Sequence, residues 1–208
     1  MREALDSTNH RLLVIDDNPA IHEDFRKIFQ RPGASADALA ESAAALFGEA
    51  SQTVPQLLFE VEFASQGAEG AALVGGARSQ NKPYALAFVD MRMPPGWDGL
   101  ETTARIWGLD PAVQIVICTA YSDHSWEDIL ARLGHTDGLV ILKKPFDNIE
   151  VLQLASTLTE KWRRTQIANR RLKELEARAE EHTAALEDAH VKLSAAREQL
   201  AARGKFRT

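Results

Sequence analysis

Four apolar runs in this chain each stop at a polar residue, and this feature constrains the fold more than any other. The runs are LLVI, YALAFV, VQIVIC and LVILK, and the polar residues at their ends are Asp16 with Asp17, Asp90, Thr119 and Lys144. Each run has the length of a buried strand, and the connections are too long for hairpins. Because parallel strands end at one edge of their sheet, we expect these polar side chains to gather there.

The segments between the runs favour helices. Helical patterns occur in IHEDFRKIFQ, QGAEGAALVGGARSQ, LETTARIWGL and SWEDILARLG. A fifth and more polar run, LFEVEFAS, alternates like a strand near a sheet edge. Among the helical patterns, Gly134 is expected to close the last one, and Pro145 to open a final helix. Five strands alternating with helices predict an α/β fold with a parallel sheet covered on both faces. The Ala- and Ser-rich segment at about 31–57 is long for a connection, so we interpret it as a flexible insertion with a helix-like piece at 41–50.

Three carboxylates beside a lysine and a hydroxyl describe a site for a divalent cation and a phosphoryl group. With VDMRMPPGWDG and LKKPF, residues 10–158 resemble the receiver domain of a bacterial two-component response regulator. The resemblance implies a flavodoxin-like, doubly wound five-stranded parallel sheet in the order 2-1-3-4-5. It also implies a phosphoprotein that catalyses only its own phosphorylation and dephosphorylation.

The resemblance further implies the roles of the acidic residues. Asp90 matches the phosphoacceptor. Mg²⁺ would be held directly by Asp17 and Asp90, through water by Asp16, and by the backbone carbonyl of Arg92.

The resemblance also assigns the lysine and the hydroxyl. Lys144 directly precedes a proline, as the family's lysine does, which selects it over Lys143 as the positive charge on the phosphoryl oxygens. Thr119 would donate a hydrogen bond to the same group. Where the family often has an aromatic switch residue, this chain has Ile141, and Tyr121 is an alternative reporter.

From Ile149 onward no glycine interrupts the sequence until Gly204, and apolar residues recur in heptads. The seam positions step by sevens from Val151 and from Leu154, which predicts that residues 159–208 form a coiled coil continuous with the last receiver helix. Several seam positions are polar or alanine, so the zipper is uneven. A parallel homodimer and a single solvated amphipathic helix both stay open.

Composition limits the function classes. The net charge of −6 and a pI near 5.5 argue against DNA as the main partner. No helix-turn-helix pattern follows the receiver, and the basic run at 161–173 is interpreted as a solvated face.

Cys118 is the only cysteine and is expected to be a buried strand thiol. A polar leader at 1–9, without a signal-peptide core or membrane span, favours a cytoplasmic location.

Three functions remain to be compared. The first is a signalling receiver that takes a phosphoryl group from a cognate histidine kinase or phosphotransfer protein and acts through its coil on a partner or an absent output domain. Its sequence resembles receivers that precede cyclic-dinucleotide or histidine-kinase outputs. The second is a constitutive coiled-coil adaptor with a passive receiver. The third is a haloacid-dehalogenase-type phosphatase, which is disfavoured because Arg92 stands where that family has a second aspartate.

Overall fold

The strands form one five-stranded sheet in the order β2-β1-β3-β4-β5, and every pairing is parallel. The computed structural model describes residues 9–29, 58–120, 126–134 and 137–204. Its strands are β1 (Arg11–Ile15), β2 (Glu60–Ala64), β3 (Leu86–Asp90), β4 (Gln114–Thr119) and β5 (Leu139–Lys143). The predicted flavodoxin-like order is therefore confirmed. The predicted insertion at about 31–57 lies outside the described residues.

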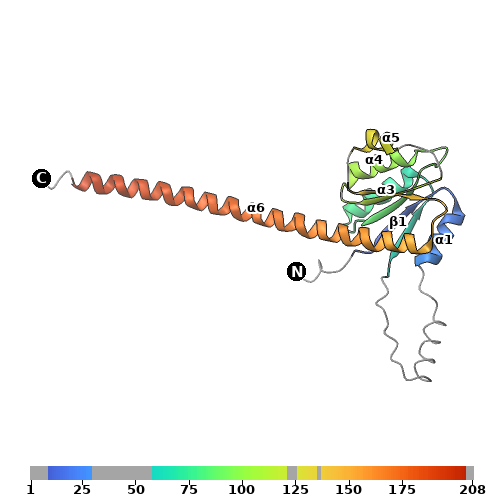
Figure 1. Cartoon of the computed structure of the whole chain (residues 1–208). Coiled ribbons are helices and arrows are strands. Elements are labelled where there is room, and N and C mark those ends of the chain that lie inside the picture. The colour runs from blue at the N-terminus through green and yellow to red at the C-terminus, as the bar shows by residue number, and fades with distance from the viewer. Residues whose placement is uncertain (1–8, 30–57, 121–125, 135–136, 205–208) are drawn as a thin grey trace, which may run out of the picture. The chain divides into compact units, whose positions relative to one another are not determined.

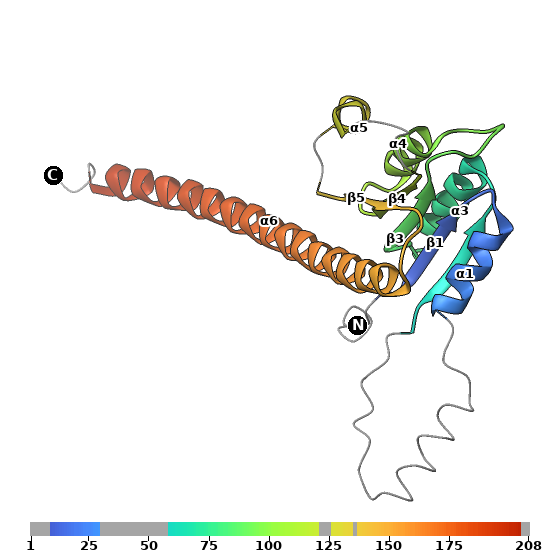
Figure 2. The same cartoon turned by 45° about the vertical axis from the view of Figure 1, so that its right-hand side comes forward.

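Helices cover both faces of the sheet. They are α1 (Pro19–Phe29), α3 (Gly67–Ser79), α4 (Gly99–Leu109), α5 (Trp126–Leu133) and α6 (Asn148–Gly204). Helices α3, α4 and α5 lie on one face, and α1 and the first turns of α6 lie on the other (Figures 1 and 2). Gly134 follows α5 with a φ of +74°, a conformation that glycine adopts without strain, so its predicted role as the helix terminator is confirmed.

Two hydrophobic cores result from this layering. Along β1, Leu13 and Ile15 point into the core beneath α3 and α4, while Leu12 and Val14 point into the core beneath α1 and α6. This alternation follows from the period of two in a strand. All four side chains are at most 1% exposed, and fully burying such a side chain contributes roughly 1.5–3 kcal/mol. The central strands are apolar because both of their faces are buried.

The final helix begins later than the sequence predicts. We expected Pro145 to open it, but α6 starts at Asn148. The reason is a capping box: the Asp147 carboxylate accepts a hydrogen bond from the Ile149 amide at 2.8 Å, and the Glu150 carboxylate accepts one from the Asp147 amide at 3.0 Å. These two bonds satisfy amides that a helix start leaves unpaired.

The chain divides into two units, Met1–Arg164 and Thr165–Thr208, and α6 contributes to both. The first unit extends beyond the boundary at residue 158 that the sequence suggested. Thr159 is 1% exposed, and the Lys161 ammonium lies 3.0 Å from a carboxylate oxygen of Asp137, so the helix still contacts the receiver there. Within the described ranges, no helix combines the length and the apolar character that crossing a membrane requires.

Candidate functional site

Asp16 is an oriented, buried carboxylate at the end of β1. Its backbone amide donates to the Ala64 carbonyl of β2 at 3.1 Å, which extends the sheet pairing by one residue. Its Oδ1 accepts a hydrogen bond from the Asn18 amide at 2.9 Å, forming a turn into α1. The other oxygen, Oδ2, is left to face the site.

Asp90 is the last residue of β3 and lies beside Cys118 of β4 in the sheet register. Its Oδ2 accepts a hydrogen bond from the Arg92 amide at 2.9 Å, so the loop that follows the strand fixes the carboxylate. The neighbouring Met91 amide donates to the Cys118 carbonyl at 2.9 Å. Asp90 is therefore held by backbone contacts on both sides, and its other carboxylate oxygen, Oδ1, takes part in the contact described next.

Lys144 joins these two carboxylates. It follows β5, and its backbone amide donates to the Thr119 carbonyl at 2.8 Å, which places it beside the end of β4. Its Nζ donates to Asp16 Oδ2 and to Asp90 Oδ1, both at 2.6 Å. The three side chains are only 22%, 4% and 11% exposed for Lys144, Asp16 and Asp90, respectively.

The electrostatics of this bridge follow from burial and from the two carboxylates. Burial lowers the pKa of Lys144, but the hydrogen bonds and negative charges of Asp16 and Asp90 outweigh it and raise the pKa above 10.5. The ammonium is therefore charged at neutral pH. Burial also raises the pKa of the adjacent Cys118 thiol to about 12, although the Lys144 ammonium acts in the opposite direction. The thiol is 2% exposed, which confirms that it is a buried strand residue.

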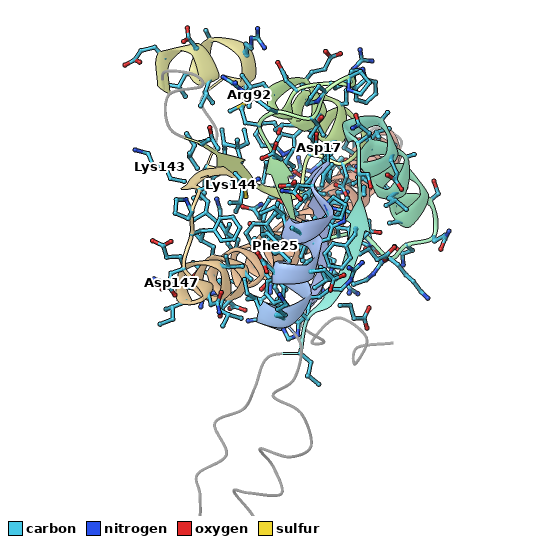
Figure 3. The ribbon with its side chains drawn as sticks, turned by 90° about the vertical axis from the view of Figure 1, so that its right-hand side faces the viewer. Asp17, Phe25, Arg92, Lys143, Lys144 and Asp147 are labelled. Carbon is cyan, nitrogen blue, oxygen red and sulfur yellow. The ribbon has the colours of Figure 1, made fainter. Side chains whose placement is uncertain are left out.

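The other predicted site residues lie around this bridge. Figure 3 shows Asp17, Arg92 and Lys144 at the same edge of the sheet. Asp17 and Arg92 are exposed, and Thr119 is half-buried with its hydroxyl donating to the Ala120 carbonyl at 2.9 Å. Tyr121, the suggested reporter, falls outside the described residues.

The donor set suits a hard divalent cation in chemistry and charge. Every candidate ligand is an oxygen, which Mg²⁺ prefers. The three carboxylates of Asp16, Asp17 and Asp90 outnumber the single ammonium of Lys144 that bridges two of them. Among the residues that the structure describes, no three acidic, histidine or cysteine side chains converge closely enough to form a metal cluster. The two that converge, Asp16 and Asp90, do so on the ammonium.

Gly99 is a site residue whose role depends on the tertiary structure. It is the first residue of α4, and its amide donates to the Met91 carbonyl at 2.9 Å. A Cβ at Gly99 would lie 2.6 Å from the Asp90 carbonyl oxygen and 2.9 Å from the Met91 Cα. The helix therefore starts directly against the backbone of Asp90, which only glycine permits.

Asp98 and Arg132 extend this arrangement to α5, and nothing in the sequence pattern indicated their pairing. Asp98 caps α4, since its Oδ1 accepts a hydrogen bond from the Glu101 amide at 2.7 Å. Its Oδ2 lies 3.1 Å from Nη1 of Arg132. Trp97 packs against the core beneath α4, and the Arg105 guanidinium lies 5.0 Å from the centre of its ring. The loop after Asp90 is thus attached to two helices.

Comparisons with known proteins agree with this fold. The response regulator receiver domain family matches residues 56–156. The structure is similar to a CheY-like response regulator receiver domain protein from Methanospirillum hungatei, with 21% identity, 74% of this chain and 97% of that chain covered, and a TM-score of 0.51. It is also similar to the receiver domain of AraT, a response regulator from Geobacillus stearothermophilus, with 23% identity, 76% and 98% covered, and a TM-score of 0.52. A structure titled adenylate cyclase from Rhodopirellula baltica has 18% identity, 79% and 98% covered, and a TM-score of 0.56.

The chain therefore contains a response regulator receiver domain. The family match begins at β2, yet β1 lies between β2 and β3 in the same sheet, so Asp16 and Asp17 are part of the domain. Residues 30–55 separate β1 and α1 from the matched region. A search of curated protein sequences gives no match.

Proposed function

We propose that the chain is a phosphorylation-dependent response regulator of a two-component system, with Asp90 as the phosphoacceptor. The observation that carries the proposal is the bridge in which Lys144 Nζ lies 2.6 Å from both Asp16 and Asp90 at the carboxyl edge of the sheet. Ligands of open parallel sheets bind at this edge. The family match adds the expectation that the partner is a histidine kinase or a phosphotransfer protein.

In the proposed transfer, a carboxylate oxygen of Asp90 attacks phosphorus. A bond forms between that oxygen and phosphorus, and the bond from phosphorus to the imidazole nitrogen of the donor histidine breaks, leaving the electron pair on the imidazole. Lys144 moves its hydrogen bond from the carboxylate to an oxygen of the phosphoryl group, and the Thr119 hydroxyl donates to a second oxygen. These contacts exist only after transfer, so they favour a changed arrangement of the β4 and β5 loops.

Receiver domains generally bind Mg²⁺ at this site. In this chain, Asp17, Asp90 and the carbonyl of Arg92 would hold the ion directly, and Asp16 through water. The bound ion supplies positive charge that offsets the repulsion between a carboxylate and an anionic phosphate. Asp16 is oriented for this role by its bond from the Asn18 amide, and Asp90 by its bond from the Arg92 amide.

Transmission is proposed to run through a parallel homodimeric coiled coil to a partner, or to an output domain beyond this chain. Support comes from the leucines that the single helix exposes beyond residue 164. Leu172 and Leu175 are 56% and 60% exposed, and both fall on the predicted seam.

The first test measures phosphorylation directly. Incubation with acetyl phosphate and Mg²⁺ is expected to give a phosphoryl adduct in intact-mass spectra of the wild type and none in Asp90→Asn. The matched control is Asp24→Asn, because Asp24 is an exposed carboxylate on α1, away from the edge. An adduct that persists in Asp90→Asn, or that is absent from the wild type, contradicts the assignment.

The second test separates a switch from a passive scaffold. Light scattering with and without Mg²⁺ and beryllofluoride, a phosphoryl mimic, should show a change in mass or shape that Asp90→Asn abolishes. A dimer that binds the mimic and does not change supports the constitutive adaptor or a rotation within an existing dimer.

A further inference from the structure

The part of α6 beyond residue 164 carries a stripe of exposed leucines. Leu172, Leu175, Leu186 and Leu193 are 56%, 60%, 71% and 53% exposed, and all occupy seam positions of the heptad pattern. Leucines repeated on one side of a solvated helix form an apolar face that is stabilised only when another helix covers it. We call these four residues the leucine stripe.

The heptad pattern begins inside the receiver, but there its apolar side chains are already buried in the receiver core. Val151 and Leu158 are 0% and 5% exposed and pack in the core with α1. Lys161, at the next seam position, forms an ion pair with Asp137, 3.0 Å from Nζ to Oδ2. The seam is therefore open to a partner helix only from Thr165 onward.

The flanks of the stripe carry charges that distinguish the two ways of pairing helices. One flank consists of the residues that directly precede the seam positions counted by sevens from Thr165. Its charged residues are all basic: Arg164, Arg171, Arg178 and Lys192. In an antiparallel pair of identical helices, like flanks face each other, so this row would meet its own copy. Basic side chains held side by side destabilise that arrangement.

A parallel pair brings opposite flanks together instead. Each residue on the basic flank then faces the residue five positions later in the other helix. Arg171 meets Glu176 of the second copy, and symmetry repeats this attractive contact twice per dimer. Lys192 meets Arg197 in the same way, which weakens pairing near the end of the helix.

We infer that a second copy of this chain covers the leucine stripe as a parallel, in-register helix that begins at Thr165, with Arg171 and Glu176 selecting the orientation. The inference rests on the dimeric transmission proposed above and specifies its geometry. The occupant is this chain itself because the same leucine stripe on a second copy can cover it, and because the attractive contact between Arg171 and Glu176 forms twice across a two-fold axis.

Cysteine cross-linking of the full chain tests the orientation. Native Cys118 is buried with a pKa of about 12, so it leaves single introduced thiols to report alone. Leu172→Cys and Leu193→Cys should each form a disulfide between identical positions of two copies, since seam positions bring Cα atoms within disulfide range. Ala177→Cys, on the outer side of the helix, is the control and should not.

An antiparallel pair aligns identical positions only at its centre, so at most one of the two seam variants would cross-link with itself. A self-disulfide at only one position would overturn the inference. So would a mixed disulfide between Leu172→Cys and Leu193→Cys when neither variant cross-links with itself. A monomer by light scattering, without cross-links at either position, also overturns it. Neither result affects the phosphoryl adduct on Asp90, so the failure of this inference and the failure of phosphorylation are distinguishable.

Charge reversal tests the selecting pair. Glu176→Lys should raise the dissociation constant of the dimer about tenfold, because two attractive contacts become repulsive. Adding Arg171→Glu to the same chain should restore most of the affinity. Glu180→Lys is the matched control, because Glu180 lies on the outer side of the helix and is expected to change affinity little. Equal weakening by Glu176→Lys and Glu180→Lys contradicts the pairing. So does a double variant, Glu176→Lys with Arg171→Glu, that recovers no affinity.

Discussion

Two glycines of α4 should respond in opposite directions to the same substitution. At Gly99, a Cβ would stand 2.6 Å from the Asp90 carbonyl oxygen, 2.9 Å from the Met91 Cα and 3.2 Å from the Asp90 carbonyl carbon. These are backbone atoms, so the strand end or the helix start must move. Overpacking of this kind destabilises by about 1–3 kcal/mol. At Gly108, by contrast, a Cβ meets nothing within 4 Å.

The expected free energies of unfolding follow from this difference. Gly99→Ala should lower stability by about 2 kcal/mol and reduce the melting temperature by about 4–8 °C. Gly108→Ala should raise stability by about 0.5–1 kcal/mol, because alanine favours a helix more than glycine does. Urea titration followed by circular dichroism measures both.

Gly99→Ala should also slow phosphorylation, since the displaced backbone is that of the proposed phosphoacceptor. The rate at which the phosphoryl adduct accumulates from acetyl phosphate, compared with that of Gly108→Ala, measures this. A Gly99→Ala variant as stable as Gly108→Ala would refute the close approach of α4 to Asp90.

Two further predictions concern the Lys144 bridge and the core beneath α6. In the absence of divalent cations at pH 7, the free energy of unfolding of Lys144→Met should be about 1–3 kcal/mol lower than that of the wild type, because two nearly buried carboxylates lose their cation. The folded pKa of Lys144 is raised, so this advantage of the wild type is complete below its unfolded pKa of about 10.5 and is lost as the pH rises through the higher folded value; a difference that already vanishes at neutral pH contradicts the bridge. Leu158→Ala should lower stability by about 2–5 kcal/mol, whereas Ile149→Ala, on the same helix but 72% exposed, should stay within about 0.5 kcal/mol. Urea unfolding of both variants checks this, and equal losses would show that Leu158 is not in the core.

The order of elements and the identity of the polar edge could be predicted from the sequence because both depend on local pattern. An apolar run that stops at Asp16, Asp90 or Lys144 marks a buried strand and its end, and the alternation with helices requires parallel pairing. The heptad pattern likewise predicted an unbroken final helix, which extends to Gly204. Each of these signals is a pattern among residues close together in the sequence, so none of them needs knowledge of distant contacts.

Other features depend on which segments meet in space. The bond from Lys144 to Asp16 joins residues 128 positions apart, and nothing near either residue encodes its length of 2.6 Å. The small size of Gly99 can be explained only once the structure shows how closely the start of α4 approaches the backbone of Asp90.

The final helix shows the division most clearly. The sequence determined one continuous heptad pattern, because periodicity belongs to the chain itself. Only the tertiary structure decided that Val151 and Leu158 pack in the receiver core while Leu172 and Leu175 stay exposed. The reason is physical: an apolar helical position is buried by whatever surface lies beside it, and the sheet with α1 lies beside the first turns of α6.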